Sequence, residues 1–199
     1  DHGMETKMAL FENGVRIALS MRYPPLTTSG FLYEGAVSNI DLTRTILEIA
    51  GISPSFESDG SSFLAELEAV SAGAAASSYW TERCVFFEYE SDRAVRCGCD
   101  KLISISASQD STTLTRAESK GYSQDSTQLY NVCPDGDESS NLASSSSQVV
   151  SEMQTVLLCH TERTQPSSTP DFSPCGPTTS TTTTTTTSAF STPSPSPSP

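Results

Sequence analysis

Four short β-strand patterns in the middle of the chain constrain its fold more than any other feature. Each is rich in β-branched, aromatic or aliphatic residues and is bounded by polar or turn-forming residues. The patterns span Val85–Tyr89, Ala94–Arg96, Lys101–Ile105 and Leu129–Val132. Short strands in close succession predict an antiparallel meander, and the polar residues 106–128 predict a long hairpin tip or insertion before the last strand.

Three segments have the apolar spacing of helices. The clearest begins after Ser38, which stands three residues before Asp41 in a capping-box arrangement. It ends before Gly51, a residue suited to a left-handed C-cap. A weaker pattern covers Phe63–Val70, and a last helix is predicted over Gln148–Leu158, where apolar residues gather on one face.

The segment Val15–Arg22 alternates between apolar and polar residues until Pro24 and Pro25, and this period of two predicts a β-strand. A strand and a helix followed by an antiparallel meander with a closing helix predict the α/β fold class. The end of an α/β layer would then precede a small antiparallel-sheet-plus-helix subdomain. The expected boundaries are 1–80 for the α/β part, 81–163 for the antiparallel subdomain and 164–199 for a disordered tail.

The predicted tail has an extreme composition. From about Pro166 the chain is mainly Ser, Thr and Pro, with an unbroken run at Thr181–Thr187. Such a segment has almost no apolar surface to bury and cannot offset the entropy of ordering. It fits either an O-glycosylated stalk or a simple spacer.

The charge balance limits the partners of the chain. The formal net charge is −13, from 11 Lys plus Arg against 24 Asp plus Glu. Nucleic acid is not expected as a partner, because phosphate binding needs a basic face. An anionic small molecule remains compatible, because a metal ion and one lysine can reverse the potential within a pocket. No apolar run reaches the length of a transmembrane segment.

Six cysteines, namely Cys84, Cys97, Cys99, Cys133, Cys159 and Cys175, lack the spacing of a common zinc site. An even count beside a mucin-like tail favours disulfides and an oxidising compartment. The expected localisation is therefore secreted, or endomembrane and lysosome-like. Unpaired buried thiols are the alternative.

The first residues carry the candidate chemistry. Asp1-His2-Gly3 joins a carboxylate and an imidazole to a glycine that permits a tight turn, so both side chains can be directed at one cation. Taken alone, the same triplet is typical of an ordinary surface turn. Lys7 alone is typical of a solvated lysine.

Together with the blocks that follow, these residues resemble the sulfatase family. The family pattern runs Asp-His/Asn-Gly, Lys, Tyr/Phe-Glu-x-Gly-Val-Arg and a helix ending in Ala-Gly, then Asp-Gly, Ala-Val-Arg-x-Gly-x-x-Lys-Leu-Ile and Leu-Tyr-Asp-Leu. The matching blocks here are Asp1–Gly3, Lys7, Phe11–Arg16, Asn39–Gly51, Asp59-Gly60, Ala94–Ile103 and Leu129–Ala143. The resemblance implies the C-terminal part of an alkaline-phosphatase-like sulfatase fold and an arylsulfatase-like sulfuric ester hydrolase.

By position, the resemblance implies roles for several residues. Asp1 and His2 would bind the active-site divalent cation, usually Ca²⁺ in this family, and Lys7 would be a catalytic residue that holds the sulfate ester. Glu12 and Arg16 would anchor the entry to the following strand, while the later blocks would build the closing antiparallel sheet. The expected partner is a small-molecule or carbohydrate sulfate ester.

The family nucleophile is a formylglycine that a formylglycine-generating enzyme makes from the first residue of a Cys/Ser-x-Pro-x-Arg motif. No cysteine of this chain has proline two residues later. The chain is therefore expected to be a C-terminal fragment whose nucleophile lies upstream, and by itself it cannot hydrolyse a sulfate ester.

Two other functions fit the same residues. One is a phosphonate or phosphodiester hydrolase of the same superfamily, with a Thr or Ser nucleophile and two metal ions. The other is a catalytically inactive, sulfatase-like binding protein tethered by its Thr- and Pro-rich tail. The nucleophile motif upstream of Asp1 distinguishes all three hypotheses.

Overall fold

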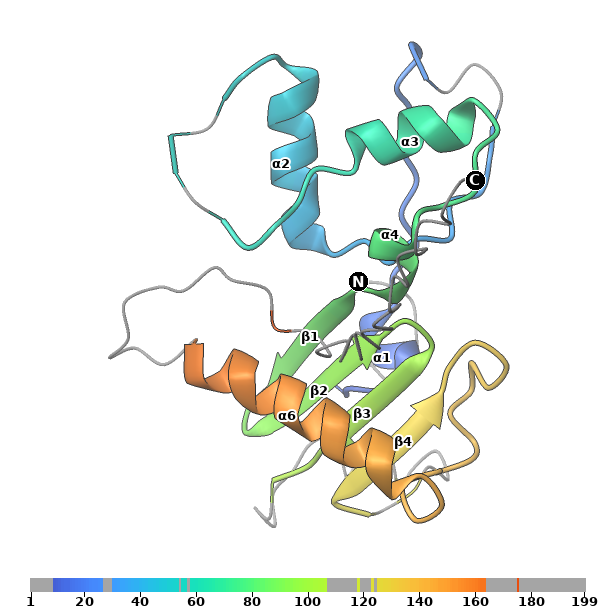
Figure 1. Ribbon diagram of the computed structural model, residues 1–199, viewed down its shortest axis with the longest axis vertical. Helices are drawn as coiled ribbons and strands as arrows, with labels where there is room; N and C mark the ends of the chain where they lie inside the picture. Colours follow the sequence, from blue (N-terminus) through green and yellow to red (C-terminus); the bar gives the residue numbers. More distant parts are fainter. Residues whose placement is uncertain are drawn as a thin grey trace, which may run out of the picture.

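The computed structural model describes residues 9–26, 30–53, 55–56, 58–106, 118, 123, 125–163 and 175. Their centre is a four-stranded antiparallel sheet whose strands neighbour one another in chain order (Figure 1). The strands are β1 (Cys84–Tyr89), β2 (Asp92–Cys97), β3 (Asp100–Ser104) and β4 (Thr127–Asn131). The α/β class and the antiparallel meander are thus confirmed, and the polar segment before β4 connects two paired strands, as predicted.

Both faces of this sheet carry buried side chains, because alternate residues of a strand point to opposite faces. In the register, Val95 lies opposite Leu102 and Leu102 lies opposite Leu129, which forms an apolar row on one face. Lys101 lies opposite Tyr130, and this pair belongs to the other face. A sheet with two buried faces needs a covering layer on each side.

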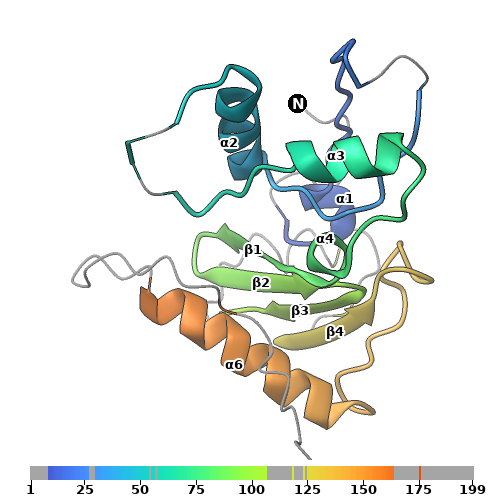
Figure 2. The same cartoon turned by 45° about the horizontal axis from the view of Figure 1, so that its top comes forward.

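Helix α6 (Ser147–Arg163) is the cover of the first face. Its residues Met153, Val156 and Leu157 pack in one apolar cluster with the row of Val95, Leu102 and Leu129. Figure 2 shows the helix lying across the strands. The helix predicted over Gln148–Leu158 is confirmed and continues to Arg163.

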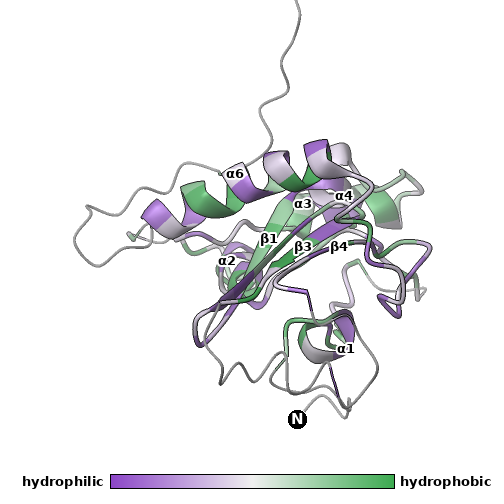
Figure 3. Cartoon of the chain, turned by 90° about the horizontal axis from the view of Figure 1, so that it is seen from below, coloured by the Kyte–Doolittle hydropathy of each residue, from purple (hydrophilic) through white to green (hydrophobic). Residues whose placement is uncertain are grey.

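The opposite face is covered by the N-terminal segment, which includes the single-turn helix α1 (Glu12–Val15). Ala9, Leu10 and Phe11 are buried there with Ile103 and Tyr130. The rings of Phe11 and Tyr130 meet edge to face, with centroids 6.4 Å apart. Figure 3 shows α6 and α1 on opposite sides of the sheet.

The strand predicted over Val15–Arg22 is wrong in the described structure. Glu12–Val15 forms a helical turn, and residues 16–22 pair with no strand among the described residues. Arg16 is still extended, with φ −82° and ψ 119°, but Ile17 and Leu19 are 57% and 52% exposed. The alternation alone could not show that the segment has no strand neighbour to bond with, which a β-strand needs.

The remaining helices are α2 (Asn39–Ile49), α3 (Leu64–Ser71) and α4 (Ser78–Glu82). The predicted capping box between Ser38 and Asp41 is present, and Gly51 has the predicted left-handed conformation, with φ 68°. Helix α3 confirms the weak pattern at Phe63–Val70. Helix α4 was not predicted, because a five-residue helix is too short to show an apolar period.

These helices share a third apolar cluster beyond the sheet. Phe63, Leu67 and Trp80 form its buried centre, and the partly buried Tyr33 and Leu42 pack against it. Trp80 and Phe63 meet edge to face with centroids 6.0 Å apart. The cluster joins α3 and α4 to α2 and to the chain that precedes it.

All six cysteines form disulfides, which confirms the disulfide prediction and overturns the alternative of free thiols. The pairs are Cys84–Cys97, Cys99–Cys133 and Cys159–Cys175. The first joins directly opposite residues of β1 and β2. The second links the β2–β3 turn to the chain after β4, and the third fastens Cys175 to α6.

Apart from Cys175, the predicted tail at 164–199 lies outside the described residues. Within the described part of the chain, no helix is both long and apolar enough to span a bilayer.

Candidate functional site

The predicted site residues Asp1, His2 and Lys7 lie outside the described residues, which begin at Ala9. Lys7 is only two residues before Ala9. The described residues nearest to it in the sequence therefore begin at Ala9.

The described chain begins in the core of the molecule. Ala9, Leu10 and Phe11 are 3%, 2% and 0% exposed against the β2–β4 face of the sheet. Glu12, the next residue, is also buried. A carboxylate at such a position is stable only when charges and hydrogen bonds compensate for its lost hydration.

Glu12 meets three other charged residues, and we call the set Glu12, Arg96, Lys101 and Glu138 the Glu12 cluster. Lys101 Nζ lies 3.0 Å from Glu12 Oε1 and 2.9 Å from Glu138 Oε1. Arg96 Nη1 lies 3.2 Å from Glu12 Oε2. The main-chain N–H of Glu12 donates to Glu138 Oε2 at 2.5 Å. Both the side chain and the backbone of residue 12 are therefore held by the sheet unit.

The charges of the Glu12 cluster balance, with two carboxylates against two cations. The Lys101 side chain is 0% exposed and that of Glu138 is 1% exposed. Burial raises the pKa of Glu138, and the Lys101 ammonium opposes that rise. Loss of one partner from a buried pair typically costs about 3–5 kcal/mol, because the other charge is left uncompensated.

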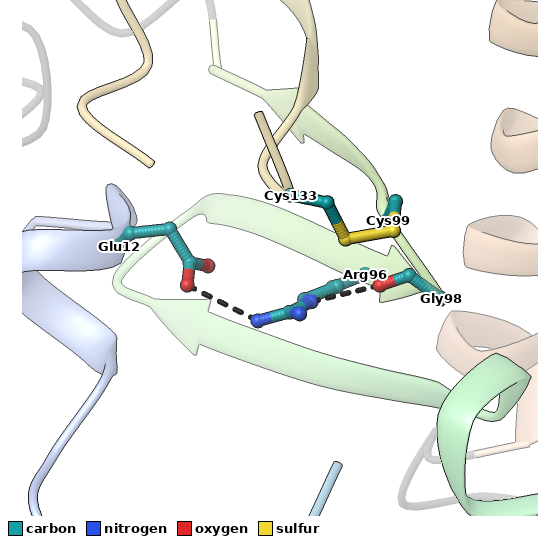
Figure 4. Close-up of a disulfide and its surroundings, with 5 residues drawn as sticks. All are labelled: Glu12, Arg96, Gly98, Cys99 and Cys133. Carbon is teal, nitrogen blue, oxygen red and sulfur yellow. Dashed lines mark hydrogen bonds and ion pairs between the residues drawn. A yellow bond between two sulfur atoms is a disulfide. The ribbon is translucent and has the colours of Figure 1, made fainter. Parts of the chain in front are cut away.

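Arg96 connects the Glu12 cluster to a disulfide (Figure 4). Its Nε donates to the carbonyl oxygen of Gly98 at 2.9 Å, while Nη1 reaches Glu12. Gly98 has φ 59°, a conformation that glycine adopts without steric cost. The adjacent Cys99 is bonded to Cys133, so the turn that Arg96 contacts is covalently tied to the chain beyond β4.

A hydrogen-bonded turn places Glu138. Asp135 accepts hydrogen bonds from the backbone N–H groups of Ser139 and Ser140 at 3.0 Å each. The hydrogen bond from the Ser139 N–H is the main cause of a lowered pKa at Asp135, and that from the Ser139 hydroxyl adds to it. Glu138 itself has φ 53°, within the left-handed region. The block Leu129–Ala143 thus has the structural role that the resemblance implied.

A second buried ion pair organises the helical part. Asp41 is 0% exposed, and its carboxylate accepts hydrogen bonds from the N–H groups of Ser38 and Ser61 at 2.7 and 2.8 Å. Arg83 Nη1 lies 3.0 Å from the same carboxylate. Gly60 lets the chain pass close to the start of α2, because a Cβ atom at residue 60 would overlap the backbone carbonyl of Ile40. The Asp59-Gly60 block is therefore also structural.

Sequence reasoning placed most of these residues in the right blocks but missed their partners. Glu12 was predicted to anchor the entry to a strand that does not form; it is instead held by the four-stranded sheet and the turn after β4, and the side chain of Arg16 is exposed. Lys101 and Glu138 were expected only to build the sheet. The available signal was a lysine within an apolar strand, because a buried lysine is almost always paired. No group of three metal-ligating residues occurs in the described segments.

The fold and its blocks define a sulfatase-type C-terminal domain. Residues 1–162 match the family described as N-sulphoglucosamine sulphohydrolase, C-terminal, and the chain belongs to this family. No curated protein sequence matches the chain.

Two solved structures are similar to parts of the chain. One shows the protein BT4656 with its substrate D-glucosamine-2-N,6-O-disulfate, at 16% identity and a TM-score of 0.45. The other, from a study of glycosaminoglycan metabolism by Bacteroides thetaiotaomicron, has 18% identity and a TM-score of 0.46. The matched regions cover 61% and 62% of this chain, and 23% and 24% of the two solved chains. The chain therefore spans about a quarter of the length of these proteins.

Proposed function

We propose that the full-length protein is a sulfatase that hydrolyses sulfate esters of small molecules or carbohydrates. The family match over residues 1–162 carries the proposal, because it includes Asp1, His2 and Lys7 together with the structural blocks behind them. The chain itself contributes part of the active site, and the nucleophile comes from the polypeptide before Asp1.

In this proposal Asp1 and His2 are ligands of a divalent cation. A carboxylate oxygen suits a hard ion such as Ca²⁺, and an imidazole nitrogen is a common additional donor. When bound, the cation would supply Lewis-acid stabilisation of the sulfuryl oxygens. Neither ligand alone makes a site, so further ligands are expected from the upstream polypeptide.

Lys7 provides a positive charge for the ester in the same proposal. Its ammonium group holds a sulfate oxygen and stabilises the charge that develops on the leaving oxygen. The nucleophile would be the hydrated aldehyde of an upstream formylglycine, which a formylglycine-generating enzyme must install. The N–S bond of an N-sulphoglucosamine is a second target, suggested by the family description.

The proposal also extends to the compartment. Three disulfides join all six cysteines, and such pairs persist in oxidising environments. This chemistry supports a secreted, endomembrane or lysosome-like location. Fractionation of cells that express the full-length protein tests it, and a reduced protein in the cytosol would contradict it.

The decisive experiment is a hydrolysis assay on the full-length protein, expressed with a formylglycine-generating enzyme. An aryl sulfate, O-sulfated and N-sulfated glucosamine, an aryl phosphonate ester and a phosphodiester are compared, with Ca²⁺ or with a chelator. We expect sulfate release that the chelator abolishes and that Lys7→Ala lowers by about 10²–10³-fold.

Other outcomes favour the rival functions. Hydrolysis of the phosphonate or phosphodiester, without sulfate release, would assign the protein to phosphoester chemistry. Binding of sulfated ligands without hydrolysis, in a protein with an unmodified nucleophile position, would favour the inactive tethered protein.

A further inference from the structure

Glu12 lies five residues after the proposed catalytic Lys7 in the sequence, whereas its partners Arg96, Lys101 and Glu138 come from the sheet and the turn after it. We infer that Lys101 and Glu138 are positioning residues for Lys7, acting through Glu12 and the buried segment Ala9–Phe11. The inference rests on the proposed function, because it assigns Lys7 to the sulfate ester. It gives the antiparallel sheet a role in catalysis besides covering the core.

Both the carboxylate and the backbone N–H of Glu12 are bound by other residues. Lys101 on β3 and Arg96 on β2 hold its carboxylate, at 3.0 and 3.2 Å. Glu138, after β4, accepts its backbone N–H. The Lys101 ammonium group also pairs with Glu138 at 2.9 Å. One cation therefore links the contact to the Glu12 carboxylate with the contact to the Glu12 backbone N–H. A shift of Lys101 would weaken both the carboxylate contact and the backbone contact of Glu12.

In this inference the buried segment Ala9–Phe11 transmits the placement of Glu12 toward Lys7. Its residues Ala9, Leu10 and Phe11 are at most 3% exposed and pack on the same sheet face as Tyr130. Close-packed side chains move little without repacking their neighbours, so the chain leaves the core at Ala9 in a defined place. A misplacement of about 1 Å in a reacting group can cost about 10²-fold in rate.

The buried charges themselves favour a positioning role. Apolar residues of similar volume often give equal or greater stability than a buried ion-pair network. Charged groups add direction, because Lys101 and Arg96 bind different oxygens of the Glu12 carboxylate, Oε1 and Oε2. The molecule also contains a matched pair without this placement, Asp41 with Arg83, whose side chains are 0% and 12% exposed.

The test compares Lys101→Met with Arg83→Met in the full-length protein. Both changes remove a cation from a buried carboxylate, but only the first touches the Glu12 cluster. Hydrogen exchange is followed in peptides that cover residues 8–15. We expect at least tenfold faster exchange there in K101M and none of this increase in R83M. Unchanged exchange in K101M would overturn the inference, whatever the activity of the protein.

A double-mutant cycle with Lys7→Ala supplies the catalytic test. We expect K101M to lower kcat/KM for the sulfate ester by tenfold or more at a temperature where the protein stays folded. In the K7A background, K101M should lower kcat/KM by less than a further twofold, because the lysine that Lys101 positions is already gone. Equal effects in both backgrounds would show a general structural role and overturn the inference.

A milder variant keeps the test decisive if K101M does not fold. Glu12→Gln retains the side-chain volume and the backbone N–H to Glu138 while removing the charge that Lys101 and Arg96 bind. We expect it to give the same pattern with a smaller amplitude. If K7A retains full activity, the proposed function fails instead, and the exchange data still decide whether the Glu12 cluster holds this segment.

Discussion

At the scale of single residues, polar side chains in the recurring blocks have structural partners that the blocks themselves do not reveal. Thr45 donates its hydroxyl to the Asp41 carbonyl at 2.9 Å and accepts the N–H of Phe63 at 3.2 Å. Asn141 accepts the N–H groups of Leu129 and Ala143 through one oxygen, at 3.0 Å each. Each side chain fastens two segments that are distant in sequence.

Gly60 offers a sharp test of this close packing. A Cβ atom at residue 60 would overlap the Ile40 carbonyl, which is backbone and cannot rotate away. We expect Gly60→Ala to lower the free energy of unfolding by about 1–3 kcal/mol, the usual cost of overpacking. Gly30→Ala is the matched control, because nothing lies within 4 Å of its Cβ position. Urea unfolding measures both, and equal stabilities would contradict the close approach.

At the scale of elements, the features that could be predicted are those that depend on residues close together in the sequence. The ends of α2 followed from Ser38, Asp41 and Gly51, because capping residues interact within one turn. The strand expected over Val15–Arg22 failed, because pairing depends on a distant partner that periodicity cannot report. Likewise, Glu12 was placed as an anchor, but its partners Lys101 and Glu138 follow only from the tertiary fold.

The turn after β4 has a pH dependence that can be measured. The pKa of Asp135 is lowered from 3.8, chiefly by the Ser139 backbone N–H. A lowered folded-state pKa contributes stability that is fully present above the unfolded pKa and is lost as pH falls through the folded value. We therefore expect stability to fall as the pH drops below about 4, and Asp135→Asn to flatten that part of the profile.

The measurement is urea unfolding of both proteins at a series of pH values from 2 to 7. The asparagine variant keeps an acceptor for Ser139, so the turn remains formed while the titration is removed. A wild-type and a variant profile that run parallel below pH 4 would show that Asp135 titrates equally in the folded and unfolded states.

At the scale of the whole molecule, a thin sheet is stabilised by covers on both faces and by covalent ties. Helix α6 and the N-terminal segment with α1 bury the two faces and lie on opposite sides of the sheet (Figures 2 and 3). The Cys99–Cys133 disulfide closes a separation of 34 residues around β3 and β4, whereas Cys84–Cys97 closes 13. The even cysteine count predicted bridges, but the pairing needed the sheet register, because only structure brings Cys84 opposite Cys97.

The two bridges therefore differ in their expected effect on stability. In the loop-entropy description, a longer closed loop removes more freedom from the unfolded chain. We expect Cys99→Ser with Cys133→Ser to cost about 4 kcal/mol, against about 3 kcal/mol for Cys84→Ser with Cys97→Ser. The larger loss has a second cause, because Cys133 lies just before the turn that carries Glu138, so its release also loosens the Glu12 cluster. Urea unfolding gives the two costs, and a smaller cost for the 99–133 pair would mean that its loop is already restricted in the unfolded state.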